Sequence, residues 1–375
     1  MNELLQVIRA LLRDEPLPEN LENFSFDTLV YQAARHNLTA MLYTAVKDDE
    51  RIPAPIKSSL KKQFMSLVNQ RIEQEYYTQK LDVFLHANGI RYAFFKGETL
   101  REVYPDPYWR SSCDVDVLFD KAYEKEIQAW LNGEGFVKTE DGNKTAAYYR
   151  GSVNVETHRR LFAERSRYAV YYEDAFARMS SEDGVKYAFS QEDFYVYFLA
   201  HAAEHFRAGG LGLRTVLDCY LYRKAKLLEE EYLHSELEKL QLLVFAQQLE
   251  ALAECCFGDG EWTEEKKFLF EYALDAGSYG NRDTATAMKT VGHDGKVKGK
   301  TRYFFAKLFP SFAYMKTYYP WVKRCPILYP FSWLVRLCAV VFCRRERVKE
   351  TLRTTRTVSK EKTDTAQRAL QMMGL

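Results

Sequence analysis

Residues 94–119 have the sequence FFKGETLREVYPDPYWRSSCDVDVLF, and the segment ends in two aspartates set among apolar residues. Asp114 and Asp116 alternate with Val115 and Val117, a pattern typical of a half-buried strand. Side chains two positions apart on a strand point to the same face, so we expect these carboxylates to stand side by side, about 7 Å apart at Cα. Two anions that close favour a bridging cation, and oxygen ligands suit Mg²⁺ or Mn²⁺. The segment therefore predicts a divalent metal site.

Composition narrows the class of protein. The length of 375 residues allows two domains, or one domain with a helical extension. With 53 basic and 52 acidic residues the net charge is +1, which makes a long nucleic-acid partner unlikely on bulk charge. The seven cysteines are irregularly spaced and form no CxxC pair, which indicates reduced thiols in a cytoplasmic protein. The N-terminal segment MNELLQVIRALLRDE lacks the basic start and cleavage site of a signal peptide.

The longest apolar run extends from Ile327 to Cys343 and is interrupted by Pro330 and Arg336. A membrane-spanning helix needs about 20 apolar residues, so we expect a buried helix here and no stable membrane span. Tryptophans and a basic cluster flank the run and keep a helix lying on a membrane surface as the alternative.

The pattern along the chain predicts an α+β fold, with a small mixed sheet between helical regions. Residues 1–89 have helical spacing, including a long helix from Pro55 to His86, and form an N-terminal helical region. Residues 90–190 form an α/β core. We expect its strands at 91–95, around Asp114, and at 136–139, 145–150 and 152–157, with a helix at 123–131.

Helices return after the core. We expect a helical domain at 191–276, a loop at 277–300, and an aromatic helical segment with a tail at 301–375, frayed from Thr351 onward. The loop prediction depends on its many glycine, aspartate and lysine residues and its lack of periodicity.

A third carboxylate lies on the strand that contains Glu156. Alternation places Asn154, Glu156 and His158 on one face of it. If this strand pairs beside the Asp114 strand, Glu156 completes a cluster able to hold two divalent ions about 4 Å apart. One ion would activate an acceptor hydroxyl, with Glu156 helping to take its proton. The other would hold the phosphates of a nucleoside triphosphate and stabilise the leaving pyrophosphate, so catalysis would be mostly positioning and charge neutralisation.

Three residues upstream favour phosphate binding. Lys96 and Gly97 lie where a strand ends and a helix begins, and glycine allows close approach of a ligand to the backbone. Amide groups at a helix start bind phosphate, and Lys96 adds a positive charge. Arg110 precedes Asp114 by four positions and could reach the same anion with its planar guanidinium group, or could form a structural salt bridge.

These motifs together resemble the uncharacterised nucleotidyltransferase family within the polymerase-β-like nucleotidyltransferase superfamily. The resemblance covers residues 30–350 and extends to the helical segment after the core and to the aromatic C-terminal segment. The matching residues are Lys96-Gly97, Tyr104-Pro105, Arg110, Asp114-Val115-Asp116, Glu156-Thr157-His158, His201, His205, Leu213-Arg214, Asp218, Phe309-Pro310, Tyr314-Met315, Tyr319-Pro320, Pro330 and Trp333.

The resemblance implies Asp114 and Asp116 as metal ligands and Glu156 as the third carboxylate. It implies a transferase that moves a nucleoside monophosphate from an NTP, with ATP expected, to an unidentified acceptor, using Mg²⁺ or Mn²⁺. One departure is that Glu98, and not serine, follows Gly97, so the serine-to-phosphate contact of the wider superfamily does not carry over. A non-catalytic protein that keeps the fold and binds a nucleotide or a partner is the alternative.

Several residues around the core allow more than one role. His201 and His205 lie four positions apart on one helix face, and with Glu204 they match the HxxEH pattern of a zinc hydrolase. Packing of the helical domain and binding of nucleotide or acceptor are the other roles for this pair. Arg214 and Asp218 are also four positions apart and are expected to pair with each other. Together with His158, these residues are candidates for supporting the metal ligands or binding the acceptor.

Overall fold

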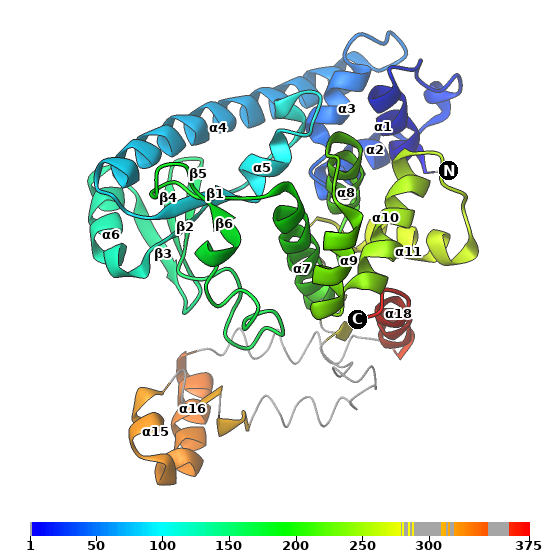
Figure 1. Cartoon of the computed structure of the whole chain (residues 1–375). Coiled ribbons are helices and arrows are strands. Elements are labelled where there is room, and N and C mark those ends of the chain that lie inside the picture. Colours follow the sequence, from blue (N-terminus) through cyan, green and yellow to red (C-terminus); the bar gives the residue numbers. More distant parts are fainter. Residues whose placement is uncertain are drawn as a thin grey trace. The chain divides into compact units, whose positions relative to one another are not determined.

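The computed structural model describes residues 2–278, 309–312, 319–343 and 360–375, together with positions 280, 284, 285, 287, 288, 314 and 315 (Figure 1). The chain forms two compact units. The first contains Met1–Ala202 and Gly212–Phe270, and the second contains Ala203–Leu211 and Glu271–Leu375. The expected loop at 277–300 and much of the segment at 301–350 lie outside the described residues.

The first unit contains a five-stranded mixed sheet, which confirms the predicted α+β class. Its spatial order is β1-β2-β5-β4-β3. Strands β2 and β5 are parallel, and the other neighbours are antiparallel. A second, two-stranded sheet pairs β6 with β7. The strands are β1 (Tyr92–Phe95), β2 (Val115–Phe119), β3 (Val137–Asp141), β4 (Thr145–Arg150), β5 (Val153–His158), β6 (Met179–Ser180) and β7 (Ala188–Phe189).

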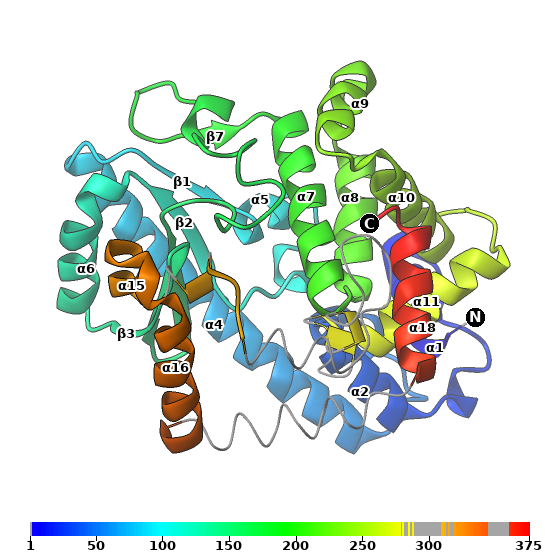
Figure 2. The same ribbon diagram turned by 90° about the horizontal axis from the view of Figure 1, so that it is seen from below.

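One face of the large sheet is covered by helices α4 (Ala54–Ala87) and α6 (Glu124–Gly133) (Figure 1 and Figure 2). Burial of each large apolar side chain stabilises the fold by about 1.5–3 kcal/mol, so this packing fixes which face of each strand points inward. The buried cluster includes Leu81, Leu85, Val115, Val117, Phe119, Ile127, Leu131, Val153 and Val155.

Because strand side chains alternate, the same packing places the even-numbered residues of β2 and β5 on the opposite face. There the sheet meets aromatic residues and helix α7 (Gln191–Gly209). The ring of Phe95 lies 4.9 Å from that of His158 and 5.7 Å from that of Tyr197. The polar residues of this face are therefore surrounded largely by aromatic and apolar side chains.

Helix α4 has clear start and stop signals. Pro55 lies in its first turn, where a missing N–H group costs nothing, and Gly89 with φ 61° follows its end. Midway along it, the buried amide of Gln74 donates to the carbonyl of Ser112 at 3.0 Å. The helix thus supports the loop that leads into β2.

Other helices of the first unit surround this framework. Arg9 on α1 donates to the carbonyls of Cys255 and Gly258 at the end of α10, which joins the two ends of the unit. The helices are α1 (Glu3–Arg13), α2 (Phe26–Arg35), α3 (Thr39–Val46), α5 (Gly97–Arg101), α8 (Leu213–Ala225), α9 (Glu230–Lys239), α10 (Leu243–Phe257) and α11 (Glu264–Ala276), which runs on into the second unit. The 3₁₀ turns are η1 (Leu21–Asn23), η2 (Pro107–Trp109), η3 (Lys121–Tyr123) and η4 (Phe176–Arg178).

The second unit contains α15 (Pro320–Arg324), η5 (Pro326–Leu328), α16 (Tyr329–Cys343) and α18 (Lys360–Met372). The tail was expected to be frayed, but α18 is a regular helix in which Ala366, Ala369 and Leu370 are buried. These apolar residues recur at helical spacing, so the helix packs through one apolar face although most of its residues are polar. Among the described residues, no helix combines the length and apolar content needed to cross a membrane.

Candidate active site

Three neighbouring strands bring the predicted acids together. Asp116 on β2 is the register partner of Glu156 on β5 and of Phe95 on β1. Lys96 directly follows Phe95, so its side chain starts beside the same two acids. The pairing of the Glu156 strand beside the aspartate strand, on which the sequence argument depended, is present.

Asp116, Glu156 and His158 form a compact cluster in which one ligand atom from each residue lies within 4.8 Å of the others. Asp116 is 2 % exposed and His158 is fully buried, whereas Glu156 is half-buried. The imidazole Nε2 lies 2.7 Å from Oδ1 of Asp116 and 3.8 Å from Oε2 of Glu156. Two carboxylates on neighbouring parallel strands thus converge on one point.

His158 is held neutral. Burial, followed by the positive charge of Lys96, lowers its pKa well below the usual range. A neutral ring has one N–H group, and Nε2 donates it to Asp116. Nδ1 is buried and finds no hydrogen-bond partner. The histidine therefore orients Asp116 without adding charge to the cluster.

Asp114 differs from its expected place. It immediately precedes β2 and does not belong to the strand itself. Its Oδ1 accepts a hydrogen bond from the hydroxyl of Ser112 at 3.2 Å. Burial and then repulsion by Asp116 raise the pKa of its carboxyl, and Lys96 opposes the rise. Asp114 thus lies close enough to Asp116 to add its negative charge to the site. The cluster of closely spaced ligand atoms, however, contains Asp116, Glu156 and His158, and not Asp114.

The ammonium group of Lys96, which was expected to contribute to phosphate binding, forms an ion pair with Asp116 in the structure. Its Nζ lies 2.7 Å from Oδ1 of Asp116, and its side chain is 18 % exposed. Burial acts to lower its pKa, but attraction by Asp116, Glu156 and Asp114 outweighs burial and raises it. The backbone of Lys96 has φ 54° and ψ −100°, a conformation that costs a non-glycine residue about 1–3 kcal/mol. This strained turn between β1 and α5 aims the side chain at the acids.

Gly97 is required by close packing. A Cβ atom at this position would lie 2.8 Å from Oγ of Ser112 and 3.3 Å from its Cβ. The absence of a side chain lets the start of α5 lie against the loop before β2. The two chain segments that frame the acids are thereby locked together.

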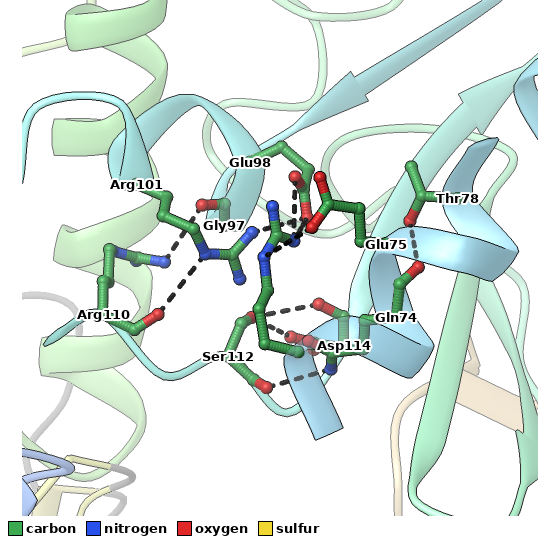
Figure 3. Close-up of polar contacts among 10 residues, drawn as sticks. Gln74, Glu75, Thr78, Gly97, Glu98, Arg101, Arg110, Ser112 and Asp114 are labelled. Carbon is green, nitrogen blue, oxygen red and sulfur yellow. Dashed lines mark hydrogen bonds and ion pairs between the residues drawn. The ribbon is translucent and has the colours of Figure 1, made fainter. Parts of the chain in front are cut away.

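Glu98 points into an ion-pair group with Arg71 and Arg101 (Figure 3). Its carboxylate accepts from Arg71 at 3.0 and 3.2 Å and from Arg101 at 2.7 Å. Burial acts to raise its pKa, but the two guanidinium groups outweigh burial and lower it. The negative charge of Glu98 is therefore neutralised by guanidinium groups on α4 and α5.

Arg110 binds Asp218 through two hydrogen bonds of 2.8 and 3.0 Å, and both side chains are buried. The hydroxyl of Tyr104 donates to the same carboxylate at 2.7 Å. Arg110 also donates to the carbonyl of Gly97 at 3.3 Å. Asp218, which was expected to pair with Arg214, binds Arg110 and Tyr104, and Arg214 donates to the carbonyl of Ser111 at 3.0 Å.

The two histidines of the HxxEH pattern do not join the acid cluster. His201 is half-buried, with its ring 5.8 Å from that of Tyr197, and His205 is exposed. In the part of the chain that the structure describes, the histidine, cysteine and acid group suited to a cation is Asp116, Glu156 and His158.

Sequence reasoning did not single out Ser112 or Gln74. Ser112 orients Asp114, and Gln74 holds the carbonyl of Ser112. A signal for Ser112 exists, since serine often bonds groups two positions along the chain. None exists for Gln74, which lies 38 positions away on a helix with no visible link to the aspartates.

The donor set fits a hard divalent cation. Asp116 and Glu156 supply carboxylate oxygens, and Asp114 adds a third negative charge beside them. Such oxygen donors suit Mg²⁺ or Mn²⁺ better than softer metals. The single imidazole nitrogen is already used to orient Asp116.

Comparison with known proteins identifies a matching protein family. The model of a protein family described as uncharacterised nucleotidyltransferase matches residues 22–258. This range contains every strand of the large sheet and all of the acids described above. No curated protein and no solved structure was found to match the chain.

Proposed function

Because the chain belongs to this family of nucleotidyltransferases, we propose that it transfers a nucleoside monophosphate from an NTP to an acceptor hydroxyl or phosphate. The new bond joins the acceptor oxygen to the α-phosphorus, and the bond from that phosphorus to the bridging oxygen breaks. Pyrophosphate leaves with the electron pair. ATP is the nucleotide that we expect to be used.

The observation that carries this proposal is the register of Asp116 with Glu156 on adjacent parallel strands, with Asp114 beside them. Concentrated negative charge in a partly buried site suits cations, and a triphosphate brings its own negative charge to the same point. Asp114, Asp116 and Glu156 would hold Mg²⁺ or Mn²⁺, which supplies positive charge opposite the phosphoryl oxygens. A fold of this kind works chiefly by positioning and charge stabilisation.

Each of the chain's own residues then has a defined task. Glu156 is the most accessible acid of the cluster, and it would accept the proton of an acceptor hydroxyl. His158 and Ser112 orient Asp116 and Asp114 through hydrogen bonds. Lys96 carries the positive charge that would meet the phosphates. Arg110, which binds Asp218, positions the Gly97 carbonyl and acts on the nucleotide indirectly.

The test is release of labelled pyrophosphate from γ-labelled NTPs, with Mg²⁺ and cell extract as the source of acceptor. We expect turnover by the wild-type protein and its loss in Asp116→Asn, which keeps the size of the side chain. Asp120→Asn is the matched control, because Asp120 follows the same strand but pairs with Arg91. Nucleotide binding without turnover under all conditions would favour the non-catalytic alternative.

A further inference from the structure

Lys96 occupies a place that a cation would take. Its ammonium group contacts Oδ1 of Asp116 at 2.7 Å, and that oxygen also accepts the hydrogen bond from His158. Both contacts engage the buried acid at the centre of the cluster, which is 2 % exposed. Asp116 therefore has little capacity for a further cation at this oxygen while Lys96 stays in place.

The charges around Lys96 are unequal. Three carboxylates, those of Asp116, Glu156 and Asp114, attract a single ammonium group. The ammonium thus compensates part of the negative charge, and a divalent cation brought to the same carboxylates would meet a like charge at close range.

The backbone around Lys96 is fixed by the two residues that follow it. Gly97 is fixed against Ser112, and Glu98 is anchored by Arg71 and Arg101. The turn is therefore held by residues 97 and 98, whereas the flexible lysine side chain is held by its ion pair with Asp116. A rotation of that side chain toward the start of α5 would free the acid.

We propose that Lys96 is a built-in counter-ion that competes with the divalent cation for Asp116, and that a triphosphate supplies its new partner. Lys96 has to leave Asp116 before the acids can hold the cation, and the incoming phosphates give the ammonium group a place to go. The cation and the nucleotide then bind cooperatively, and the cation binds weakly when no nucleotide is present. This inference rests on the proposed function.

The experiment is calorimetric titration of Mn²⁺ into the metal-free, full-length protein without nucleotide. Lys96→Met removes the competing charge, and we expect Mn²⁺ to bind at least about tenfold more tightly than to the wild type. Lys96→Gln keeps a hydrogen-bond donor but no charge, and it gives a second reading if the methionine variant folds poorly. Lys186→Met is the matched control, because Lys186 forms an ion pair of the same 2.7 Å length with Asp82.

Adding Asp116→Asn to either Lys96 variant should abolish the gained affinity, which locates the site. Equal or weaker Mn²⁺ binding by both Lys96 variants, with the wild type still binding Mn²⁺, would overturn the counter-ion role and leave the proposed transferase intact. Absence of Mn²⁺ binding in every variant, with and without NTP, would overturn both the counter-ion role and the metal-dependent function.

Discussion

Asp116 and Glu156 are register partners on parallel strands β2 and β5, and their carboxylates lie on the sheet face opposite α4 and α6. Their shared register places two side chains of like charge next to each other at one level of the sheet. Such a pair is unfavourable by itself, and Lys96 compensates it in the structure. The two like charges lower local stability, but they concentrate the negative charge that a cation-dependent phosphoryl-transfer site requires.

Glu156→Gln should reduce turnover by about 100-fold or more while leaving the affinity for nucleotide far less changed. The amide has the shape of the acid but cannot accept the acceptor's proton or contribute negative charge. Comparing kcat with the Kd for nucleotide separates the two effects. Glu164→Gln is the control, because Glu164 is an exposed acid paired with Arg160. Unchanged turnover in Glu156→Gln would remove this residue from the reaction.

Asp218→Asn should destabilise the protein by about 3–5 kcal/mol, because it leaves the buried Arg110 without its counter-charge. Replacing both partners, as in Arg110→Met with Asp218→Leu, should cost less than the sum of the single changes. Urea unfolding of the wild type, Arg110→Met, Asp218→Leu and the double variant measures the coupling, and Asp218→Asn is measured beside them. Additive losses would show that the two side chains act independently and would contradict the described pair.

Much of this architecture follows from short-range patterns. The strand that ends at Phe95, the long helix before it and the strands around Glu156 have clear alternation or helical spacing and strong stop signals such as Gly89. Apolar residues on one face of each strand were enough to predict that Glu156 faces away from the core.

Long-range partners could not be obtained in the same way. The pairing of Asp218 with Arg110 joins residues 108 positions apart. From spacing alone, Arg214 on the same helix was an equally plausible partner for Asp218. The position of Lys96 on Asp116 depends on an unusual backbone conformation that no sequence pattern signals. Asp114 was placed on the strand because alternation does not show where backbone pairing begins.

Gly97→Ala should destabilise the protein by about 1–3 kcal/mol, because the new methyl group would overlap the side chain of Ser112. Adding Ser112→Ala removes the hydroxyl that causes the closest contact and should recover part of the loss. Thermal unfolding of both single variants and the double variant measures the recovery. If Ser112→Ala makes Gly97→Ala worse, the clash is not the cause. Activity should stay low in the double variant, because Asp114 loses its hydrogen bond.

The ion-pair group of Glu98, Arg71 and Arg101 should make stability depend on pH. The two guanidinium groups hold the pKa of Glu98 below its ordinary value against the effect of burial. A carboxyl whose pKa is lowered by folding stabilises the protein above its unfolded pKa. That stabilisation is lost as the pH falls through the lowered, folded-state value, because protons then bind the unfolded chain more readily.

Glu98→Gln should therefore lower the free energy of unfolding by about 1–3 kcal/mol near neutral pH, since hydrogen bonds between charged groups are lost. The difference from the wild type should shrink as the pH falls below the ordinary pKa of 4.5. Urea unfolding at a series of pH values gives both curves. Glu75→Gln is the control, because Glu75 is 52 % exposed and 4.0 Å from Arg71, so it should change stability little at any pH. A gap between wild type and Glu98→Gln that persists undiminished in acid would show that the charge of Glu98 is not its source.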